Sequence, residues 1–275
     1  MGFIQLVTDR VQRASEFARF KNLLTSYNLC IQHNVVVPKV YLVLSNDEAK
    51  ELQWQSLSNR LPNVFTVRPS VFLNNRYDYM LRDDGATLQN FTTKKKSTLH
   101  DIYEEQRKVT CDIDGASMLF EEFPCVGDTL QYPTHYRLHA FYGGIALIQI
   151  VTADNQMGWC NTNGKMLATA NNVGLDGYIP KDEIRESLIN VGQRLSIATK
   201  QPYIRIDFVL STRGPMFRSF ACIPGDVRSQ TFANFYKQLD QKLGDEWEAA
   251  EQRINHGNNP TAPATVRQDT PDDNA

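Results

Sequence analysis

The sequence has no long hydrophobic run and no excess of basic residues. No stretch of its 275 residues approaches the roughly 20 consecutive apolar residues that a membrane-spanning helix needs, so we expect no membrane span. Lysine and arginine number 29 against 31 aspartate and glutamate residues, whereas a general nucleic-acid binder usually carries a basic excess. The first ten residues lack the basic and then apolar segments of a signal peptide. These absences predict a cytoplasmic protein that binds no nucleic acid.

Cysteine and histidine are few, and they are not spaced as metal ligands. The chain has five residues of each kind. The odd cysteine count and the absence of a CxxC pair argue against a disulfide framework and against a zinc ribbon. The histidines form neither an HxH nor an HExxH spacing, so no zinc site is expected. We therefore expect reduced cysteines, as is usual in the cytosol.

What is present is the composition of a globular protein and an α+β order of elements. Apolar residues make up 41% of the chain and charged residues 22%, and a chain of this length can bury a full core. Apolar residues at helical spacing predict helices, and alternating or β-branched runs predict strands. The expected helices span residues 9–27, 97–108, 181–198 and 229–247, and the expected strands span 35–44, 64–68, 118–123, 135–142, 145–151, 202–210 and 216–223.

Two segments have neither pattern. Residues 154–179 are rich in asparagine and glycine and predict a long loop, which in a compact domain is usually functional or mobile. From residue 256 onward the chain has no apolar period, so residues 256–275 are predicted to be a disordered tail. Between residues 70 and 94 a polar stretch predicts a hairpin.

The most informative segment is the strand predicted over residues 202–210. Side chains alternate between the two faces of a strand, so the isoleucines at 204 and 206 face the core while Arg205 and Asp207 share the other face. One interpretation is a structural salt bridge. The other is the floor of a ligand site, because a carboxylate with phosphate oxygens suits Mg²⁺ and a planar guanidinium suits phosphate.

This segment, together with others along the chain, resembles a known family. Arg205-Ile-Asp207, followed by a predicted hairpin and residues 217–225, is similar to the closing metal-site hairpin of ATP-grasp enzymes. Within that superfamily the chain most resembles the TupA-like (teichuronopeptide-biosynthesis) branch, and the resemblance extends over residues 8–254. The other matching stretches follow in the family's order at residues 8–10, 65–69, 118–123, 135–144 and 240–247.

The resemblance implies an α+β ATP-grasp fold, in which two α+β lobes clamp a nucleotide between antiparallel sheets, with ATP and Mg²⁺ as cofactors. It implies that Arg68 binds the phosphates, that Glu121, Glu122 and Phe123 contact adenine and ribose, and that Asp207 binds the metal. Plainer interpretations remain open for these side chains. Arg68 is then a surface residue before a proline, and the glutamates are carboxylates that face water at the end of a strand.

An acceptor site is also implied. Arg137 and His139 share one face of their predicted strand, and with Arg205 they would form a cationic wall suited to a carboxylate substrate. We assign these three residues to catalysis. The alternative is that they are exposed residues on a sheet face. The loop predicted over residues 154–179 is either a lid, which would exclude water from a reactive intermediate, or a solvated loop.

The same resemblance divides the chain into four parts. Residues 1–62 are predicted to form an N-terminal helix and a small α/β subdomain. Residues 63–123 would be the small ATP-grasp lobe, with the phosphate strand, a hairpin and the hinge. Residues 124–255 would be the large lobe with a C-terminal helix, and residues 256–275 the tail.

Three departures from the family pattern bear on activity. The second metal-binding strand normally carries Glu and then Asn or Thr two residues later, but this chain has Ser219 and Ala221 there. Arg68 stands where the family has a lysine. The loop at residues 70–78 contains no glycine, although glycine lets backbone approach phosphate closely. Asp207 would then be the only carboxylate of the usual metal-binding set.

These observations lead to three hypotheses. The first is an ATP-dependent carboxylate–amine ligase that acts through an acyl phosphate, on a polysaccharide uronic acid or a peptide precursor. The second is a degenerate nucleotide-binding relative with a regulatory or scaffolding role and no catalysis. The third is a glycan-associated protein without a nucleotide site, in which aromatic side chains line a sugar groove: Tyr77, Tyr79, Tyr142 and Trp159.

Overall fold

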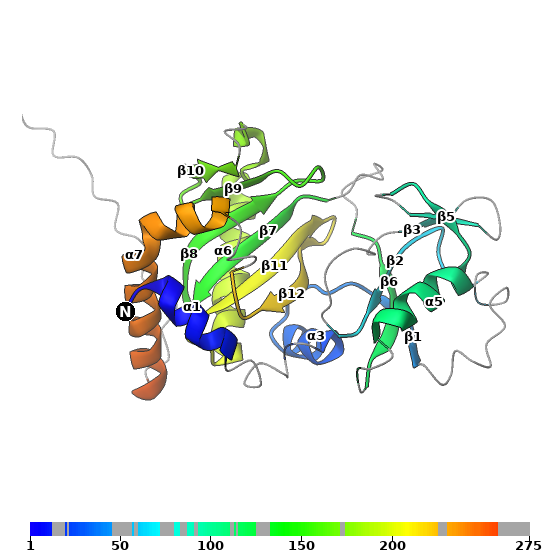
Figure 1. Ribbon diagram of the computed structural model, residues 1–275, viewed down its shortest axis with the longest axis horizontal. Helices are drawn as coiled ribbons and strands as arrows, with labels where there is room; N and C mark the ends of the chain where they lie inside the picture. The colour runs from blue at the N-terminus through cyan, green and yellow to red at the C-terminus, as the bar shows by residue number, and fades with distance from the viewer. Residues whose placement is uncertain are drawn as a thin grey trace, which may run out of the picture.

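The computed structural model contains two six-stranded antiparallel sheets with helices packed on their faces (Figure 1). It describes residues 1–12, 20, 22–45, 57, 60–71, 80–82, 87–90, 93–110, 113, 115–124, 133–170, 174–224 and 230–257. No helix among these residues is long and apolar enough to cross a membrane. Residues 72–78 of the loop expected over 70–78 and the part of the predicted tail beyond residue 257 lie outside the described residues.

The first sheet is formed by strands β1 to β6, and one of its faces carries a hydrophobic core. Helix α5 (Leu99–Thr110) packs on that face, where Phe65, Val67 and Phe120 are buried together with Ile102. The opposite face of the same strands carries Arg68 and Glu121, because side chains alternate along a strand. In spatial order the strands are β1 (Val40–Ser45), β6 (Ser117–Glu122), β2 (Val64–Pro69), β3 (Met80–Arg82), β4 (Leu88–Asn90) and β5 (Lys96–Ser97).

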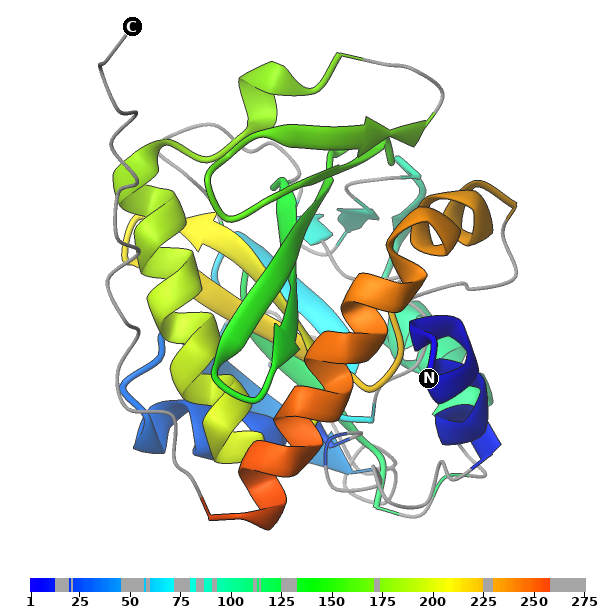
Figure 2. The ribbon, with the colours of Figure 1, turned by 90° about the vertical axis from the view of Figure 1, so that its left-hand side faces the viewer.

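The second sheet is covered by helices on both faces, as Figure 2 shows. Helix α6 (Asp182–Thr199) packs on one face, where Leu188 and Leu195 join Leu138 and Ile206 in the core. On the other face lie helices α1 (Phe3–Gln12) and α7 (Gln230–Asn255). In spatial order the strands are β10 (Met166–Thr169), β9 (Met157–Cys160), β8 (Gly144–Val151), β7 (His135–Phe141), β11 (Ile204–Ser211) and β12 (Gly214–Ala221).

Residues 33–39 hydrogen-bond to both sheets. They follow helix α3 (Leu23–Gln32), which lies between the two sheets in Figure 1. Val36 forms a parallel bridge with Met216, and its carbonyl accepts from the Phe217 amide at 2.9 Å. Three residues later the Lys39 carbonyl accepts from the Glu122 amide at 2.8 Å. This short segment therefore fixes the edge strand β12 of the second sheet next to β6 of the first sheet.

The expected single helix over residues 9–27 is wrong, because Asn22, which has an extended backbone, interrupts it. Helix α1 begins at Phe3 and ends at Gln12, and α3 begins only at Leu23. Asn22 has an extended backbone, and its side chain accepts from the Thr25 amide at 3.1 Å. This is N-cap geometry, which begins a new helix rather than continuing one.

The expected loop over residues 154–179 is also wrong. It contains β9 and β10, and η4 (Asp176–Tyr178) follows them. Trp159 and Cys160 are buried, and β9 pairs with the second half of β8, from Ile148 to Val151. Each of these strands has only four residues, so each depends on pairing with its neighbouring strand. The segment therefore belongs to the sheet, and the lid expected from a loop is not supported.

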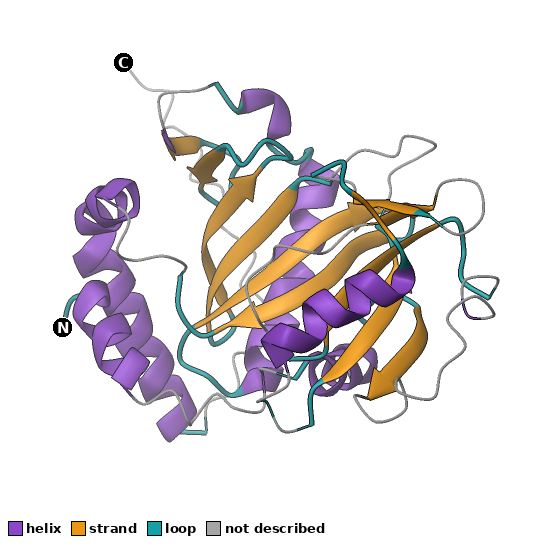
Figure 3. Ribbon diagram, turned by 45° about the vertical axis from the view of Figure 1, so that its right-hand side comes forward, coloured by secondary structure: helices purple, strands orange, loops and turns teal. Residues whose placement is uncertain are grey.

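Most other elements match the sequence-based expectations. The hairpin around Gly143 and Gly144 is confirmed, since β7 and β8 pair antiparallel across it. The hairpin expected between residues 70 and 94 is confirmed by the pairing of β3 with β4. The strand expected from Val35 begins at Val40, because Val36 bridges to the second sheet. Figure 3 shows that helices occupy outer faces of both sheets.

Candidate functional site

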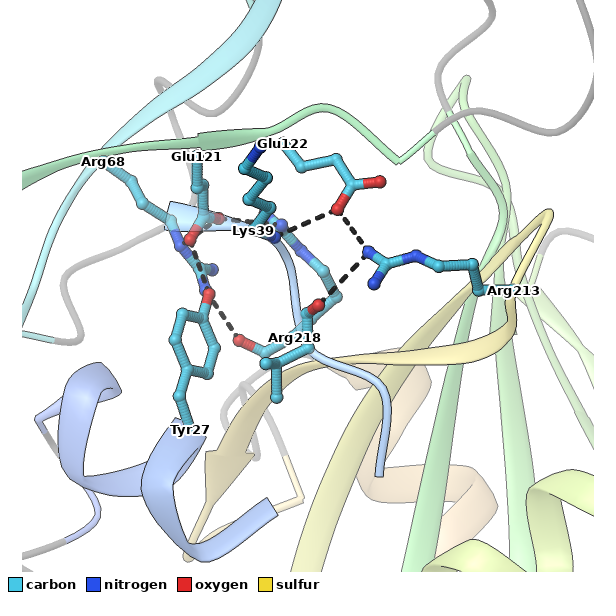
Figure 4. A network of polar contacts seen from close by, with 8 residues as sticks. Tyr27, Lys39, Arg68, Glu121, Glu122, Arg213 and Arg218 are labelled. Carbon is cyan, nitrogen blue, oxygen red and sulfur yellow. Dashed lines mark hydrogen bonds and ion pairs between the residues drawn. The ribbon is translucent and has the colours of Figure 1, made fainter. Parts of the chain in front are cut away.

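Glu121 is the centre of a buried polar cluster between the two sheets (Figure 4). It lies on β6 and is fully buried. Its Oε1 is 2.9 Å from Nε of Arg68 on β2 and 3.0 Å from Nη1 of Arg218 on β12. Its Oε2 accepts from the hydroxyl of Tyr27 on α3 at 2.6 Å. We call these four residues the Glu121 cluster.

Further hydrogen bonds connect the members of this cluster with one another. Arg68 Nη2 donates to the Tyr27 hydroxyl at 2.6 Å and to the Arg218 carbonyl at 2.9 Å. Burial raises the pKa of Tyr27 well above its ordinary value, so the hydroxyl stays protonated and can donate to Glu121. Arg68 is therefore not the surface residue that one interpretation of the sequence predicted. It is a buried cation that contacts both sheets.

Asp207 is the centre of a second buried cluster, on β11 and its neighbours. Arg205 donates two parallel hydrogen bonds to it, from Nε to Oδ1 and from Nη2 to Oδ2, each 2.8 Å long. Ser219 donates to Oδ2 at 3.2 Å, and Arg137 Nε lies 3.8 Å from the same oxygen. Burial alone would raise the pKa of Asp207, but the guanidinium groups of Arg205 and Arg137 outweigh burial and lower it. We call these four residues the Asp207 cluster.

Arg218 and Ser219, neighbours on β12, join the two clusters into one polar region, because Arg218 contacts Glu121 and Ser219 contacts Asp207. His135 on β7 is a buried histidine. Burial lowers the pKa of this histidine to about 3, and the positive charges of Arg218, Arg137 and Arg68 lower it further, while Asp207 acts in the opposite sense. The charges of both clusters thus act on a single imidazole, although they come from different sheets. Arg68 and Asp207 each contact β12, through the Arg218 carbonyl and the Ser219 hydroxyl, and their sharing of one ligand site stays a prediction.

A β-bulge places two neighbouring residues of β12 in different clusters. Asp207 is paired with Ser219, but Phe208 is paired with Phe217, so Arg218 is an extra residue on this strand. A bulge of this kind re-aims side chains and is common next to functional sites. Here Ser219 reaches Asp207 while Arg218 reaches Glu121 across the junction.

His139 is uncharged and is enclosed by two tyrosines. It lies on the same face of β7 as Arg137, as expected, but it is fully buried. Nδ1 is 3.0 Å from the Tyr203 hydroxyl and Nε2 is 3.2 Å from the Tyr236 hydroxyl. Burial, and then the charge of Arg205, lowers its pKa to about 3. The expected cationic wall therefore does not include His139, and its charge comes from Arg137 and Arg205.

Glu122 contacts a different part of the junction from its neighbour in sequence. Its Oε2 accepts from the Lys39 amide at 3.0 Å and from Arg213, which lies in the β11–β12 turn (Figure 4). Arg213 also donates to the Val37 carbonyl at 3.3 Å. Phe123 follows directly after β6 and is buried. Glu122 is therefore a half-buried ion-pair partner, and contacts of Glu122 and Phe123 with adenine or ribose stay predictions.

The donor set suits an anion better than it suits Mg²⁺. Both oxygens of Asp207 already accept from Arg205, and Mg²⁺ needs carboxylate or phosphate oxygens in an octahedral arrangement. No group of three or more His, Cys, Asp or Glu side chains that could hold a metal ion occurs in the part of the chain that the structure describes. The residues present therefore do not fit a metal site at Asp207, whereas guanidinium groups fit phosphate or carboxylate.

Comparison with solved structures defines the class of fold. D-alanine–D-alanine ligase from Bacillus anthracis matches with a TM-score of 0.54 at 14% identity, over 87% of this chain and 69% of the ligase. The same ligase complexed with ATP matches with a TM-score of 0.53 at 13% identity, over 87% of this chain and 68% of the ligase. The α+β architecture with two antiparallel sheets is thus the ATP-grasp fold, as the sequence predicted.

A family model narrows this class. The model of TupA-like ATP-grasp proteins matches residues 93–248, which is more than half of the chain. The chain belongs to the TupA-like ATP-grasp family, which confirms the resemblance seen in the sequence. A search of curated proteins returned no match.

Sequence reasoning did not identify several residues of the polar region. Tyr27 is the last residue of the helix predicted over residues 9–27, and nothing in the sequence marks its hydroxyl as a partner of Glu121. Arg218 depends on a bulge that no local pattern reveals. His135 was seen only as part of a family stretch. A possible signal was the succession Arg218-Ser219 inside an otherwise apolar strand, because two polar residues in a row break the alternation.

Proposed function

We propose that this chain binds ATP at the junction of its two sheets and acts as an ATP-dependent carboxylate–amine ligase. The observation that carries the proposal is the convergence of Arg68 from the first sheet with Arg137, Arg205 and Arg218 from the second. Membership in the TupA-like ATP-grasp family supports it. The similarity of fold to a ligase that was solved with ATP is consistent with it.

Each cation has a part in this proposal. Arg68 and Arg218 lie at the contact between the sheets, so they would hold the phosphates of the nucleotide. Arg137 and Arg205 lie beside Asp207 on the second sheet and would orient an acceptor carboxylate, because a planar guanidinium binds a carboxylate through two parallel hydrogen bonds. Glu121, near the end of β6, would exchange its contacts with the two arginines for contacts with the ligand.

The substrates are part of the proposal as well. From the family resemblance we infer an acceptor carboxylate on a polysaccharide uronic acid or on a peptide precursor, and an amine as the second substrate. The ligase class activates the carboxylate through an acyl phosphate. In this chain positioning and charge neutralisation would come from the arginines, which is how the protein contributes in phosphoryl transfer generally.

Two measurements test the proposal. The melting temperature of the full chain is followed with ATP, ADP and AMP, each with and without Mg²⁺, and ATP is expected to raise it by mass action. Release of ADP and phosphate is then assayed across uronic acids, peptides and amines. Stabilisation by ATP together with acceptor-dependent ADP release supports the ligase. No ATP effect on melting and no turnover would overturn it.

A second candidate is favoured by one specific observation. Both oxygens of Asp207 are held by Arg205 at 2.8 Å, so the carboxylate that the family pattern assigns to the metal is already neutralised. This arrangement supports a nucleotide-binding protein without catalysis, with a regulatory or scaffolding role. Saturable ATP binding with no ADP release in a single-turnover experiment, across the same acceptors, would decide for this candidate.

A further inference from the structure

We propose that the polyphosphate of the nucleotide is held by guanidinium groups alone, with no divalent cation bound by protein carboxylates. This inference rests on the proposed nucleotide site and gives it a chemistry that the family pattern does not predict. Arg68, Arg137, Arg205 and Arg218 would supply the positive charge that acidic side chains and Mg²⁺ would otherwise supply.

The first argument is that Asp207 has little capacity left for a metal. Arg205 contacts both of its oxygens, Ser219 donates to Oδ2, and Arg137 lies 3.8 Å from that oxygen. A divalent cation at Asp207 would have to displace these donors and would lie next to two guanidinium groups. Like charges repel each other strongly at such distances in a buried site, so these donors disfavour a divalent cation at Asp207.

The second argument concerns the partner strand. At the β12 position opposite Asp207, where the family pattern has a glutamate, this chain has Ser219, and two residues later it has Ala221. The bulge adds Arg218 at the same place. Compared with the family pattern, Ser219 removes a negative charge and Arg218 adds a positive one. The composition of the site therefore suits an anion better than a cation.

The third argument is the charge of the combined region. The Glu121 and Asp207 clusters contain four guanidinium groups and two carboxylates, so guanidinium groups outnumber carboxylates within these eight residues, a composition that suits a polyphosphate. Thr66 lies on the same face of β2 as Arg68 and opposite Glu121. It is fully buried, and its hydroxyl has no hydrogen-bond partner among the described residues, so it can donate to an anion.

Isothermal titration of the full chain with ATP tests the inference. One titration uses buffer made metal-free over a chelating resin, because a dissolved chelator is itself an anion, and the other adds Mg²⁺. We expect dissociation constants that agree within about threefold, a difference below 1 kcal/mol. Binding that needs Mg²⁺, with a loss of about tenfold or more in metal-free buffer, would overturn the inference.

Asp207→Asn separates the two roles of this carboxylate. If Asp207 only neutralises Arg205, the amide leaves an additional positive charge, and ATP binding in metal-free buffer is expected to stay equal or become tighter. If Asp207 holds a metal ion, the variant loses the Mg²⁺-dependent part of binding, and the inference is wrong. Circular dichroism melts confirm that the variant is folded.

Arg218→Met tests the cation that the bulge adds. Hydrogen bonds to charged groups contribute about 1.5–3 kcal/mol, so we expect ATP binding to weaken by roughly tenfold to a hundredfold, equally with and without Mg²⁺. Because this substitution leaves Glu121 with one arginine fewer, the double variant Arg218→Met with Glu121→Gln is prepared in parallel. Arg107→Ala on α5 removes the same charge on the far side of the first sheet and should leave binding unchanged.

The outcomes separate this inference from the proposed function. ATP binding that occurs only with Mg²⁺ overturns the inference and leaves the nucleotide site standing. If ATP fails to bind under both conditions, the proposed function falls, and inorganic triphosphate is titrated in metal-free buffer. Saturable triphosphate binding that Arg218→Met weakens would still support a guanidinium site for polyphosphate, and its absence would overturn the inference as well.

Discussion

Glu121 is a single buried side chain that contacts residues from three other elements. Tyr27, Arg68 and Arg218 reach it from α3, β2 and β12. Two buried cations around one carboxylate are stable only while that carboxylate is charged, because a buried charge without compensation is costly. At the scale of a residue, the junction therefore depends strongly on this one group.

Glu121→Gln is expected to lower the free energy of unfolding by about 3–5 kcal/mol, since it keeps the shape of the side chain but leaves two buried guanidinium groups near a neutral amide. Urea unfolding at neutral pH measures the change. The matched control is Glu104→Gln on α5, whose ion pair with Arg107 is 2.9 Å long but half-exposed. That pair should contribute less than about 1 kcal/mol. Equal effects of the two substitutions would contradict the prediction.

His135 and His139 predict how stability depends on pH. Both have pKa values of about 3 in the folded chain, below the ordinary value of 6.5. Below pH 6.5 the unfolded chain therefore binds protons that the folded chain does not, so the free energy of unfolding falls as the pH falls. Between pH 7 and pH 5 the loss is roughly 2 kcal/mol for each histidine.

His139→Gln tests this dependence and should remove about half of it, because glutamine can hydrogen-bond to the same two tyrosine hydroxyls without titrating. Urea unfolding at pH 7 and at pH 5 gives the two free energies for the wild type and the variant. His135→Gln should act similarly. A variant with the full dependence of the wild type would show that the buried histidine is not the cause.

At the scale of an element, residues 240–247 of α7, which match the last stretch of the family pattern, pack against helix α1. Asp240 on α7 accepts from the Ile4 amide at 2.7 Å, in the first turn of α1. Gly244 faces the start of the chain so closely that a Cβ there would lie 2.2 Å from the Met1 carbonyl oxygen. Trp247 contacts the Phe3 ring in an edge-to-face arrangement. These residues therefore hold the N-terminal helix on α7.

Arg10 connects the contact between α1 and α7 to the polar region. Its guanidinium carbon lies 4.9 Å from the centre of the Trp247 ring, and Nη1 donates to the Tyr203 carbonyl at 2.6 Å. The Tyr203 ring stacks on Trp247, and its hydroxyl contacts His139. Helix α1 thus supports one of the two tyrosines that enclose His139.

Gly244→Ala should loosen α1 from α7, because the added methyl needs the space of the Met1 carbonyl. We expect a loss of about 1–3 kcal/mol in the free energy of unfolding and faster hydrogen exchange in residues 3–12, followed by mass spectrometry. Gly174→Ala is the control, since no heavy atom lies within 4 Å of the position that its added methyl group would take. Unchanged hydrogen exchange in α1 would show that the contact between α1 and α7 tolerates the added methyl group.

At the scale of the whole molecule, the two sheets meet through charged and hydrogen-bonded contacts. The junction consists of the Glu121 cluster, the pair of Glu122 with Arg213, and the hydrogen bonds of residues 33–39. The hydrophobic cores lie on each side of it, against α5 in the first sheet and against α6 in the second. A charged ligand at the junction would therefore contact both sheets.

ATP is accordingly expected to slow hydrogen exchange in both sheets at once. Residues 64–69 and 117–122 in the first sheet and residues 204–221 in the second should gain protection together, because ligand binding stabilises whatever it contacts. Strand β10, at the far edge of the second sheet, provides an internal control and should change little. Protection confined to one sheet would place the nucleotide elsewhere.

The local pattern of the sequence was sufficient for elements whose burial repeats along the chain. Strand β11 alternates apolar and charged residues, and α6 carries an apolar stripe, so both were predicted within two residues of their observed ends. The presence of Arg205 and Asp207 on one face followed from the same alternation. The family resemblance, which rests on the order of several short stretches, gave the ATP-grasp fold.

Tertiary structure decided what depends on contacts between distant segments. Strand β9 pairs with the edge of β8 and β10 then pairs with β9, and α3 begins where Asn22 caps it. Neither event is visible in local periodicity. The partners of Glu121 come from three separate elements, and Arg218 reaches it through a bulge. The sequence determined which groups can carry charge, but only packing determined that the two carboxylates would be neutralised by arginines, because burial requires each charge to have a partner.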